Sequence, residues 1–186
     1  MDKKDLIVVA ALELFVKKGF DATPTAAIAK AAGVSNGTLF HYFKTKEMLI
    51  NSLYADTKER LSVVLMDTAQ KGTSIKGKFR LLWEEMIVWS IDNPLKFHFF
   101  QQFSNSPYID KLTKEEGQMR FEFVNQLLLE GQNAEVLKAA PLELLKSVAM
   151  ATIVGTIQYF LEKPDAFKHP DIQEQAFLIF WTALKE

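Results

Sequence analysis

Cysteine is absent from the 186 residues, so the chain can form neither a disulfide framework nor a thiolate metal site. Glycine (8 residues) and proline (6 residues) fall below their usual shares of about 7% and 5%, which predicts few turns and long elements. Apolar runs such as 176–181 are far shorter than the ~20 residues of a membrane span, and the N-terminal sequence lacks a signal-peptide pattern. These absences predict a cytoplasmic protein with no metal, no cofactor and no membrane partner.

Signatures of catalysis are also missing. The three histidines, His41, His98 and His169, are scattered, and the sequence has no Gly-rich phosphate loop, HExxH or GxSxG motif. Adjacent carboxylates such as Glu84 and Glu85 do not face each other on a helix. The sequence therefore predicts no catalytic residues and a protein that is not an enzyme.

Apolar residues recur at helical spacing along most of the chain. Ile7, Ala11, Leu14 and Phe15 fall at i, i+4, i+7 and i+8, which is one stripe of an amphipathic helix, and no stretch alternates with period two. We expect an all-α protein of about nine helices, near 3–18, 24–31, 35–43, 46–70, 75–92, 94–103, 111–130, 141–162 and 171–184.

The segment from residue 23 to residue 49 is the most informative part of the sequence. We expect Thr23 to cap a short helix that Gly33 ends, and Ser35 and Thr45 to cap the two helices that follow. Ile28, one of several small or apolar residues here, lies where two crossing helices would touch. Such a helix-turn-helix presents its second helix to the major groove of DNA.

The charge distribution is compatible with that interpretation. Residues 1–48 hold seven lysines and five acidic residues, a net charge of +2, whereas the rest of the chain carries −3. A small basic end on an acidic body fits nucleic-acid binding through a limited surface. No arginine precedes Arg60, so the commonest contact to guanine is not available to this segment.

The second short helix carries residue types suited to DNA contacts. Asn36 can pair with adenine, Thr38 can reach base edges or phosphate, and Gly37 allows a close approach of the backbone. An Asn-Gly pair is also typical of hairpin turns, but no alternating apolar runs flank it here. Candidate donors to phosphates follow within six residues: His41, Tyr42, Lys44 and Lys46.

Two further interpretations are open in this segment. Phe40 and Phe43 are expected to be core residues rather than DNA contacts. Lys30 and Lys44 are either phosphate contacts or ordinary solvated lysines of the surface.

At many spaced positions the first 50 residues resemble the DNA-binding domain of the TetR family of bacterial transcriptional repressors. Pro24, Thr25, Ala26 and Ala27 depart from the family pattern, which leaves open which bases are contacted. Beyond these residues the resemblance is one of architecture alone. The matching residues are Ala10 to Phe15, Gly19, Phe20, Ile28, Ala29, Ala32 to Ser35, Gly37 to Leu39, Tyr42, Phe43, Lys46 and Leu49.

The resemblance implies a homodimer whose paired recognition helices, about 34 Å apart, bind a pseudo-palindromic operator on double-stranded DNA. It implies a helix-turn-helix DNA-binding domain in residues 1–47 and an effector-binding and dimerisation domain in residues 48–186. The expected DNA-binding residues are Lys30, Ser35, Asn36, Gly37, Thr38, Leu39, His41, Tyr42 and Lys46.

Aromatic residues are concentrated in the middle of the chain, where residues 79–123 hold ten of the 22. They would line an apolar ligand pocket with a few polar groups, or form a plain helical core. Similar repressors have a pocket in this part, which favours the first interpretation. The expected pocket residues are Trp83, Met86, Trp89, Phe100, Phe103, Tyr108, Phe121 and Gln158.

The last two predicted helices have the composition of a subunit interface or of an internal core. Ala149, Ala151 and Gly155 would allow close helix approach, and the final helix is apolar nearly all round. With the resemblance, we favour the interface. Its expected residues are Leu145, Val148, Thr152, Tyr159, Phe177, Phe180 and Trp181.

The favoured function is a repressor that a small, largely apolar effector releases from DNA. One alternative is a DNA-binding dimer that does not respond to an effector. The other is a helical small-molecule binder or enzyme without a role on DNA.

Overall fold

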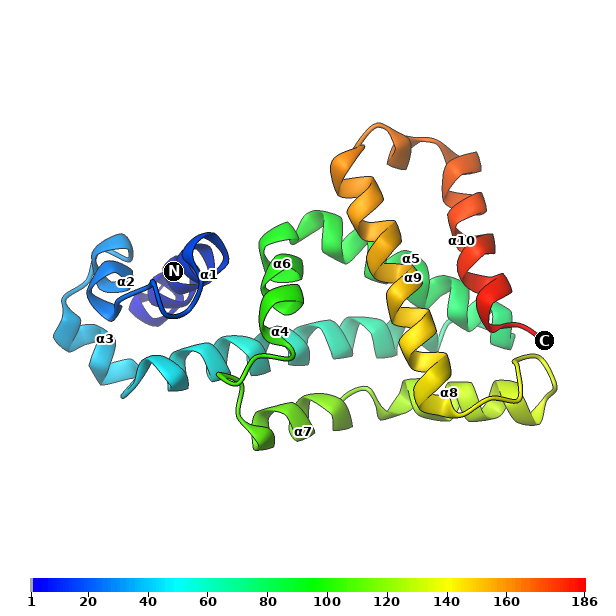
Figure 1. Ribbon diagram of the computed structural model, residues 1–186, viewed down its shortest axis with the longest axis horizontal. Coiled ribbons are helices and arrows are strands. Elements are labelled where there is room, and N and C mark those ends of the chain that lie inside the picture. The colour runs from blue at the N-terminus through cyan, green and yellow to red at the C-terminus, as the bar shows by residue number, and fades with distance from the viewer. Residues whose placement is uncertain (1) are drawn as a thin grey trace. The chain divides into compact units, whose positions relative to one another are not determined.

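The computed structural model describes residues 2–186, which form ten α-helices, one 3-10 helix and no β-strand (Figure 1). The predicted all-α fold is confirmed. The helices divide into two compact units. Unit 1 runs to Arg60 and also includes Pro94–Met119, and unit 2 comprises Leu61–Asn93 and Arg120–Glu186.

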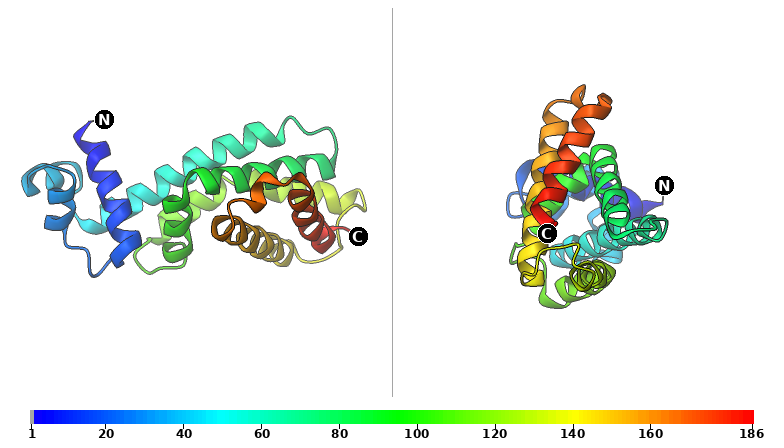
Figure 2. Two further views of the ribbon diagram at one scale, coloured as in Figure 1. Left: turned by 90° about the horizontal axis from the view of Figure 1, so that it is seen from above. Right: turned by 90° about the vertical axis from the view of Figure 1, so that its right-hand side faces the viewer.

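Unit 1 contains the three N-terminal helices, the first part of a long helix, and two helices from the middle of the chain (Figures 1 and 2). The long helix continues into unit 2. The bounds are α1 (Lys3–Lys18), α2 (Thr25–Ala31), α3 (Asn36–Tyr42), α4 (Lys46–Ala69), α6 (Pro94–Phe103) and α7 (Lys111–Met119).

Local sequence signals account for most boundaries in unit 1. Gly19 and Gly33 have φ values of +80° and +67°, a backbone conformation that favours glycine. Gly19 ends α1, and Gly33 lies in the turn that follows α2. Ser35 Oγ accepts a hydrogen bond at 3.1 Å from the third residue of α3, and Thr45 Oγ1 accepts one at 3.0 Å from α4. The predicted caps at Ser35 and Thr45 are therefore confirmed.

Thr23 does not cap α2, so that prediction is wrong. The residue at the cap position is Pro24, which makes no side-chain hydrogen bond. The Thr23 side chain is fully buried, and its hydroxyl donates to the carbonyl oxygens of Gly19 at 2.6 Å and Leu14 at 3.2 Å. The hydroxyl thus satisfies carbonyl groups at the end of α1 instead of amide groups at the start of α2.

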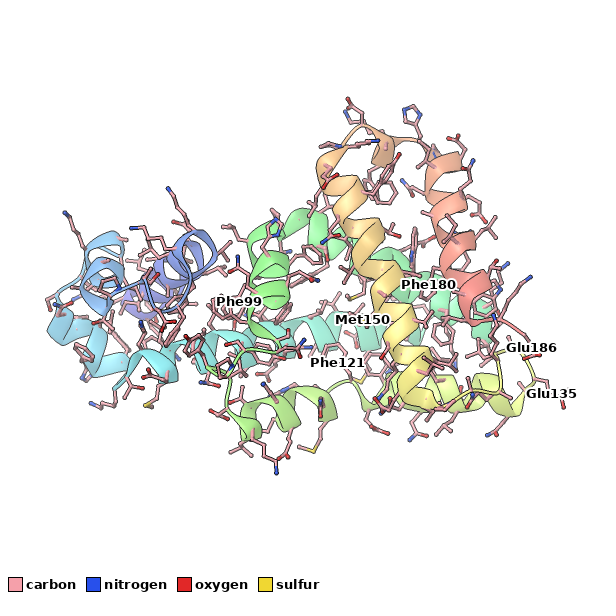
Figure 3. All side chains as sticks on the ribbon, in the orientation of Figure 1. Phe99, Phe121, Glu135, Met150, Phe180 and Glu186 are labelled. Carbon is pink, nitrogen blue, oxygen red and sulfur yellow. The ribbon has the colours of Figure 1, made fainter. Side chains whose placement is uncertain are left out.

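The core of unit 1 joins the N-terminal helices to α6. Phe15 of α1 packs against Phe103 of α6, with ring centroids 6.2 Å apart, and Phe99 packs against Phe103 at 5.0 Å. All three rings are buried in one cluster with residues of α2, α3 and α4. Figure 3 marks Phe99 on α6. The side chains of α6 therefore complete the hydrophobic core of the N-terminal helices.

Unit 2 is built around α9 and α10, which lie side by side and pack on α5 (Figures 1 and 2). A turn with the 3-10 helix η1 (Ala166–Lys168) joins the two helices. The remaining helices are α5 (Ile75–Asp92), α8 (Glu122–Asn133), α9 (Leu142–Glu162) and α10 (Pro170–Leu184).

Aromatic side chains join α5 to α10 in the core of unit 2. Phe79 lies 6.4 Å from Phe180, and Trp83 lies 5.6 Å from Phe177 in an edge-on arrangement, both between ring centroids. Figure 3 marks Phe180 on α10, and at the end of that helix it shows Glu186 near Glu135. Glu186 N donates to the carbonyl oxygen of Val136 at 3.1 Å, which ties the C-terminal residues to the segment after α8.

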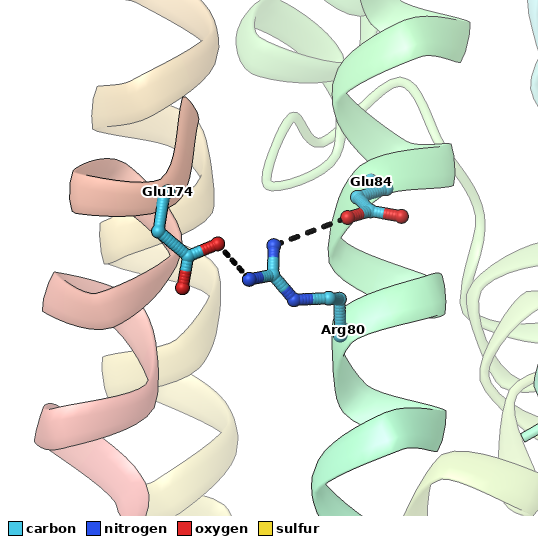
Figure 4. A network of polar contacts seen from close by, with 3 residues as sticks. All are labelled: Arg80, Glu84 and Glu174. Carbon is cyan, nitrogen blue, oxygen red and sulfur yellow. Dashed lines mark hydrogen bonds and ion pairs between the residues drawn. The ribbon is translucent and has the colours of Figure 1, made fainter. Parts of the chain in front are cut away.

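An ion-pair cluster joins the same two helices (Figure 4). Arg80 of α5 donates to Glu84 on its own helix at 3.2 Å and to Glu174 on α10. The guanidinium carbon also lies 4.1 Å from the ring centroid of Phe177. The planar guanidinium group thus pairs with carboxylates at its edge and stacks on an aromatic ring with its face.

Two predicted boundaries differ from the structure. The expected helix over 111–130 is interrupted at Arg120, because α7 packs in unit 1 and α8 in unit 2. Gly117 shows the packing of α7 within unit 1, because it is buried and a Cβ atom there would lie 3.5 Å from the Tyr54 ring. The second helix ends at Asn133 rather than near residue 130.

One helix within residues 2–186, α9, is long and apolar enough to cross a membrane by length and composition alone. Helices of soluble proteins that are covered by other helices pass the same test, so this feature by itself does not indicate a membrane protein.

We predict that Gly72→Ala destabilises unit 2. A methyl group at Gly72 would lie 2.8 Å from the backbone nitrogen and Cα of Lys78, so the first turn of α5 would have to move. Overpacking of this kind lowers the free energy of unfolding by about 1–3 kcal/mol, which urea denaturation measures. Thr73→Ala at the exposed neighbour is the control. Equal stability of the two variants would contradict the prediction.

Candidate nucleic-acid interface

The crossing of α2 and α3 fixes which face of α3 is exposed. Ile28 of α2 and Leu39 of α3 are both fully buried in the core of unit 1. The turn between the helices is held by a hydrogen bond of 3.0 Å from Val34 N to the carbonyl oxygen of Ala29. This is the geometry of a helix-turn-helix, in which the second helix is held by its inner face.

The outer face of α3 carries five of the nine predicted DNA-binding residues. Ser35, Asn36, Gly37, His41 and Tyr42 are all exposed. They lie at the N-terminus and along the outer side of the helix, where base edges and phosphates would be reached. The structure thus brings these residues together on one surface.

Two hydroxyl groups at the start of α3 already have partners. Ser35 Oγ accepts the hydrogen bond from Thr38 N, and it lies 3.0 Å from Thr38 Oγ1. These hydroxyls stabilise the first turn of the helix, and Thr38 is half-buried. Asn36 and Gly37 are therefore the residues of this turn that are most available to a DNA base.

Leu39 cannot contact DNA, so its inclusion among the DNA-binding residues is wrong. Its side chain has no exposed area, because it fills the core between the N-terminal helices. The adjacent Phe40 is predicted from the sequence to be a core residue, but its side chain is 41% exposed. One residue turns a helix by 100°, so the inward position of Leu39 places Phe40 at the outer face. Phe43, in contrast, is buried as predicted.

The Lys46 side chain is held within unit 1, so its contact with a DNA phosphate stays a prediction. Its Nζ donates to the carbonyl oxygens of Phe20 at 2.8 Å and Thr23 at 3.2 Å, and it lies 4.1 Å from the ring centroid of Phe20. The ammonium group therefore joins the first turn of α4 to the connection between α1 and α2. Its charge is satisfied inside unit 1.

Two other lysines that are candidates for phosphate contacts are accessible to solvent. Lys30 at the end of α2 and Lys44 between α3 and α4 are exposed. Both remain candidates for phosphate contacts, whose number sets the salt dependence of DNA binding.

The segment after α6 is anchored to the N-terminal helices, which the sequence does not predict. The ring of Tyr108 stacks on Phe20 with centroids 4.1 Å apart, and its hydroxyl donates to Asp21. This hydrogen bond, with burial and the negative charge of Asp21, raises the pKa of Tyr108. Asn51 Nδ2 of α4 donates to the carbonyl oxygen of Tyr108 at 2.9 Å. Such contacts link residues far apart in sequence, and no local pattern indicates them.

A half-buried lysine lies deeper in unit 1. Lys58 Nζ of α4 lies 5.2 Å from the ring centroid of Phe100 and 5.8 Å from that of Tyr54. Burial lowers the pKa of Lys58, because desolvation penalises its charged form. Burial raises the pKa of Tyr54 for the same reason, and its hydrogen bond with Ser104 acts in the opposite direction.

The eight predicted pocket residues do not lie in one unit. Phe103, Tyr108 and Phe100 belong to unit 1, where they pack with the core of the N-terminal helices. Gln158 is exposed on α9. A surface hollow of unit 2 is lined by none of the eight residues; its lining is Gln132, Glu135, Leu137, Ala139 and Glu186. Four of the predicted pocket residues lie in unit 2 and are buried or half-buried: Trp83, Met86, Trp89 and Phe121.

Four of the seven predicted interface residues are core residues of their own chain. Their side chains are at most 6% exposed, so a second subunit cannot reach them in this arrangement, and the prediction is wrong for these four: Leu145, Phe177, Phe180 and Trp181. Tyr159 is 39% exposed, and Val148 and Thr152 are half-buried. The remaining three thus lie toward the outer face of α9.

Two family descriptions match the chain. Residues 7–53 match the bacterial regulatory proteins of the tetR family, and residues 74–184 match a tetracyclin repressor-like C-terminal domain. A crystal structure from Shewanella sp. PV-4, described as a tetR-family transcription regulator, is 31% identical with a TM-score of 0.91, and 100% of both chains is covered.

Three further similarities differ in extent. A TetR-family regulator from Marinobacter aquaeolei VT8 has a TM-score of 0.89 over 99% of this chain and 96% of that chain; at 22% identity it shows the fold alone. The regulator QacR of Staphylococcus aureus is 49% identical over 49 residues, which are 26% of each chain. The match to YuxN of Bacillus subtilis, at 32% identity over 79 residues, covers 42% of this chain and 27% of that protein. The chain thus matches about a quarter of the length of these curated relatives.

The fold and the exposed face of α3 define a helix-turn-helix protein of the kind that binds DNA. The chain belongs to the tetR family of bacterial regulatory proteins.

We predict opposite effects from two neighbouring lysines. Lys46→Met removes two charge-assisted hydrogen bonds to buried carbonyls, so the free energy of unfolding should fall by about 1–3 kcal/mol. The salt dependence of DNA binding should not change. Lys44→Met should leave stability unchanged and reduce the slope of log K against log [salt] by about one.

Urea denaturation and fluorescence anisotropy with a duplex selected from a random pool measure both quantities. A lowered salt slope for Lys46→Met with unchanged stability would show that its ammonium contacts phosphate.

Proposed function

We propose that this chain represses transcription by binding a pseudo-palindromic operator as a homodimer, and that a small, largely apolar effector releases it from the DNA. The observation that carries the proposal is the outward presentation of α3, with Leu39 buried beneath it and Asn36 exposed on it. We place the protein in the cytoplasm, where its DNA partner is found.

The proposed division of labour assigns DNA binding to residues 1–47 and effector binding and dimerisation to residues 48–186. The segment Pro94–Met119 has a special position, because it belongs to the second part in sequence but packs with the N-terminal helices. A movement of α6 or of the Tyr108 contact would therefore reach the helix-turn-helix directly. We place the effector in unit 2 and retain Trp83, Met86, Trp89 and Phe121 as candidate contacts.

The proposed dimer interface is the outer face of α9 with the adjacent face of α10. This face is apolar or small at successive turns, and a Cβ placed on Gly155 would have no atom of the described chain within 4 Å apart from its chain neighbours and the nearby backbone of α9. Apolar side chains exposed next to it would be covered by a second copy. The revised interface residues are Leu144, Val148, Ala151, Thr152, Gly155, Tyr159, Leu178 and Ile179.

Operator release tests the whole proposal. The full chain is used to select binding sequences from random duplexes, and its affinity for them is measured by anisotropy with and without compounds that bind the protein. Allosteric coupling of about 1–3 kcal/mol corresponds to a 5- to 150-fold loss of DNA affinity. Selection of no sequence would contradict DNA binding, and an affinity unchanged by every bound compound would contradict effector release.

We predict that Asn36→Ala weakens operator binding and relaxes specificity at one base pair. An asparagine that hydrogen-bonds an adenine contributes about 1–3 kcal/mol of discrimination. Anisotropy titrations with the selected duplex and its single-base variants measure the change. Asn133→Ala, at an exposed position of unit 2, is the control. An unchanged preference at every position would exclude Asn36 from base contact.

We predict that Gly155→Gln weakens the dimer without unfolding the chain. The space around Gly155 within its own chain accepts a larger side chain, whereas a closely approaching second helix would not. The dimer dissociation constant should rise about tenfold or more, equivalent to about 1.4 kcal/mol. Sedimentation equilibrium measures the constant, and Lys76→Gln on the exposed start of α5 is the control. A dimer of unchanged strength would place the interface elsewhere.

A further inference from the structure

Two buried polar atoms of α5 lack a hydrogen-bond partner in the part of the chain that the structure describes. They are Nε1 of Trp83 and Oγ of Ser90. The side chain of Trp83 is 2% exposed and that of Ser90 is fully buried. An indole N–H is a donor only, so Trp83 requires an acceptor. Buried donors without an acceptor are rare in folded proteins, and each calls for a physical explanation.

Ser90 differs from several other hydroxyl residues within the helices of this protein. A helical serine or threonine commonly donates to the carbonyl oxygen four residues earlier. Thr57, Ser147 and Thr156 do so, at 2.7, 2.8 and 2.8 Å. The Ser90 hydroxyl makes no such bond within the described residues. Its donor is therefore free to bind a group that is not part of its own helix.

The two donors lie on the same face of α5. Residues seven positions apart differ by about 20° around a helix and by about 10.5 Å along its axis. Ile87 lies between them on this face and is fully buried, and Met86 is half-buried. The face is thus apolar except for two hydrogen-bond donors two turns apart. This composition is typical of a site for a mainly apolar ligand that a few polar groups orient.

Side chains of α10 cover one end of this face. The ring of Trp83 lies edge-on to Phe177, with centroids 5.6 Å apart. Arg80 stacks on the same Phe177 and pairs with Glu174 of α10 (Figure 4). Arg80 and Glu174 are partly exposed. Trp83 thus contacts Phe177, which in turn contacts the partly exposed Arg80.

We propose that unit 2 binds a mainly apolar molecule at the buried face of α5, where Trp83 Nε1 or Ser90 Oγ donates a hydrogen bond to an oxygen acceptor of that molecule. This inference rests on the proposed effector-responsive function and specifies the chemistry of the effector. A pure hydrocarbon, or a cation that carries donors only, would leave both groups unpaired. The site therefore selects ketones, esters, acids or ethers over hydrocarbons of the same shape.

The test compares two fluorescent probes on the purified full chain. The first is 6-propionyl-2-(dimethylamino)naphthalene, an apolar ketone, and the second is N-phenyl-1-naphthylamine, which has no oxygen. The wild type should bind the ketone saturably. The ketone has a single oxygen, so at least one of the variants Ser90→Ala and Trp83→Phe should weaken ketone binding about 3- to 10-fold, because it removes the donor to that oxygen. Binding of the amine should change by less than about twofold in Ser90→Ala, which removes a single oxygen atom.

Two controls separate loss of the donor from loss of structure. Ser147→Ala removes an exposed hydroxyl that is bonded to its own helix, so it should not change ketone binding. Ser90→Ala should unfold at the same temperature as the wild type or higher, because it removes an unpaired buried hydroxyl and introduces the better helix former. Weaker ketone binding by this stable variant would thus report the hydrogen bond.

The outcomes distinguish this inference from the proposed function. A wild type that does not bind the ketone, or that binds it no more tightly than both donor variants do, overturns the inference. Ketone binding that depends on the donors but leaves operator affinity unchanged supports the site and contradicts effector release. Operator release by a compound that binds equally well to both donor variants supports the function and overturns this site.

Discussion

The shared core of α1, α2, α3 and α6 is the constraint on which the proposed DNA interface depends. Leu39 is buried in that core, so the opposite face of a helix of only seven residues must be exposed. A helix this short is not stable alone in water and takes its position from tertiary packing. Lys46 adds a fixed point, because its ammonium group joins α4 to the connection between α1 and α2.

Unit 2 combines strong packing with incomplete hydrogen bonding. Aromatic rings and the Arg80 ion pairs join α5 to α10, and they account for a well-defined arrangement of these helices. Two donors in the same core, on Trp83 and Ser90, have no acceptor within the residues described. Sites that bind ligands often keep polar groups whose partners are supplied by the ligand. The same helix thus contributes both to the stability of unit 2 and to its proposed selectivity.

The outer face of α9 explains why composition alone is ambiguous in this protein. The helix is apolar enough to resemble a membrane span, but its inner side packs on α5 and α10 and its outer side carries small residues such as Gly155. Leu145 and Tyr159 have similar apolar character in the sequence, yet one is buried and the other is exposed. Which side chains meet a partner depends on how the helix is rotated in the unit.

The sequence by itself determined the helical class, most helix boundaries and the helix-turn-helix, because caps, glycine turns and apolar spacing act between residues close in the chain. The tertiary structure decided the roles of Leu39, Phe40 and Lys46, which depend on helix rotation and on carbonyl groups more than 20 residues away. It also decided that α6 belongs with the N-terminal helices and that α7 and α8 are separate. Contacts over such separations leave no periodic signal in the sequence.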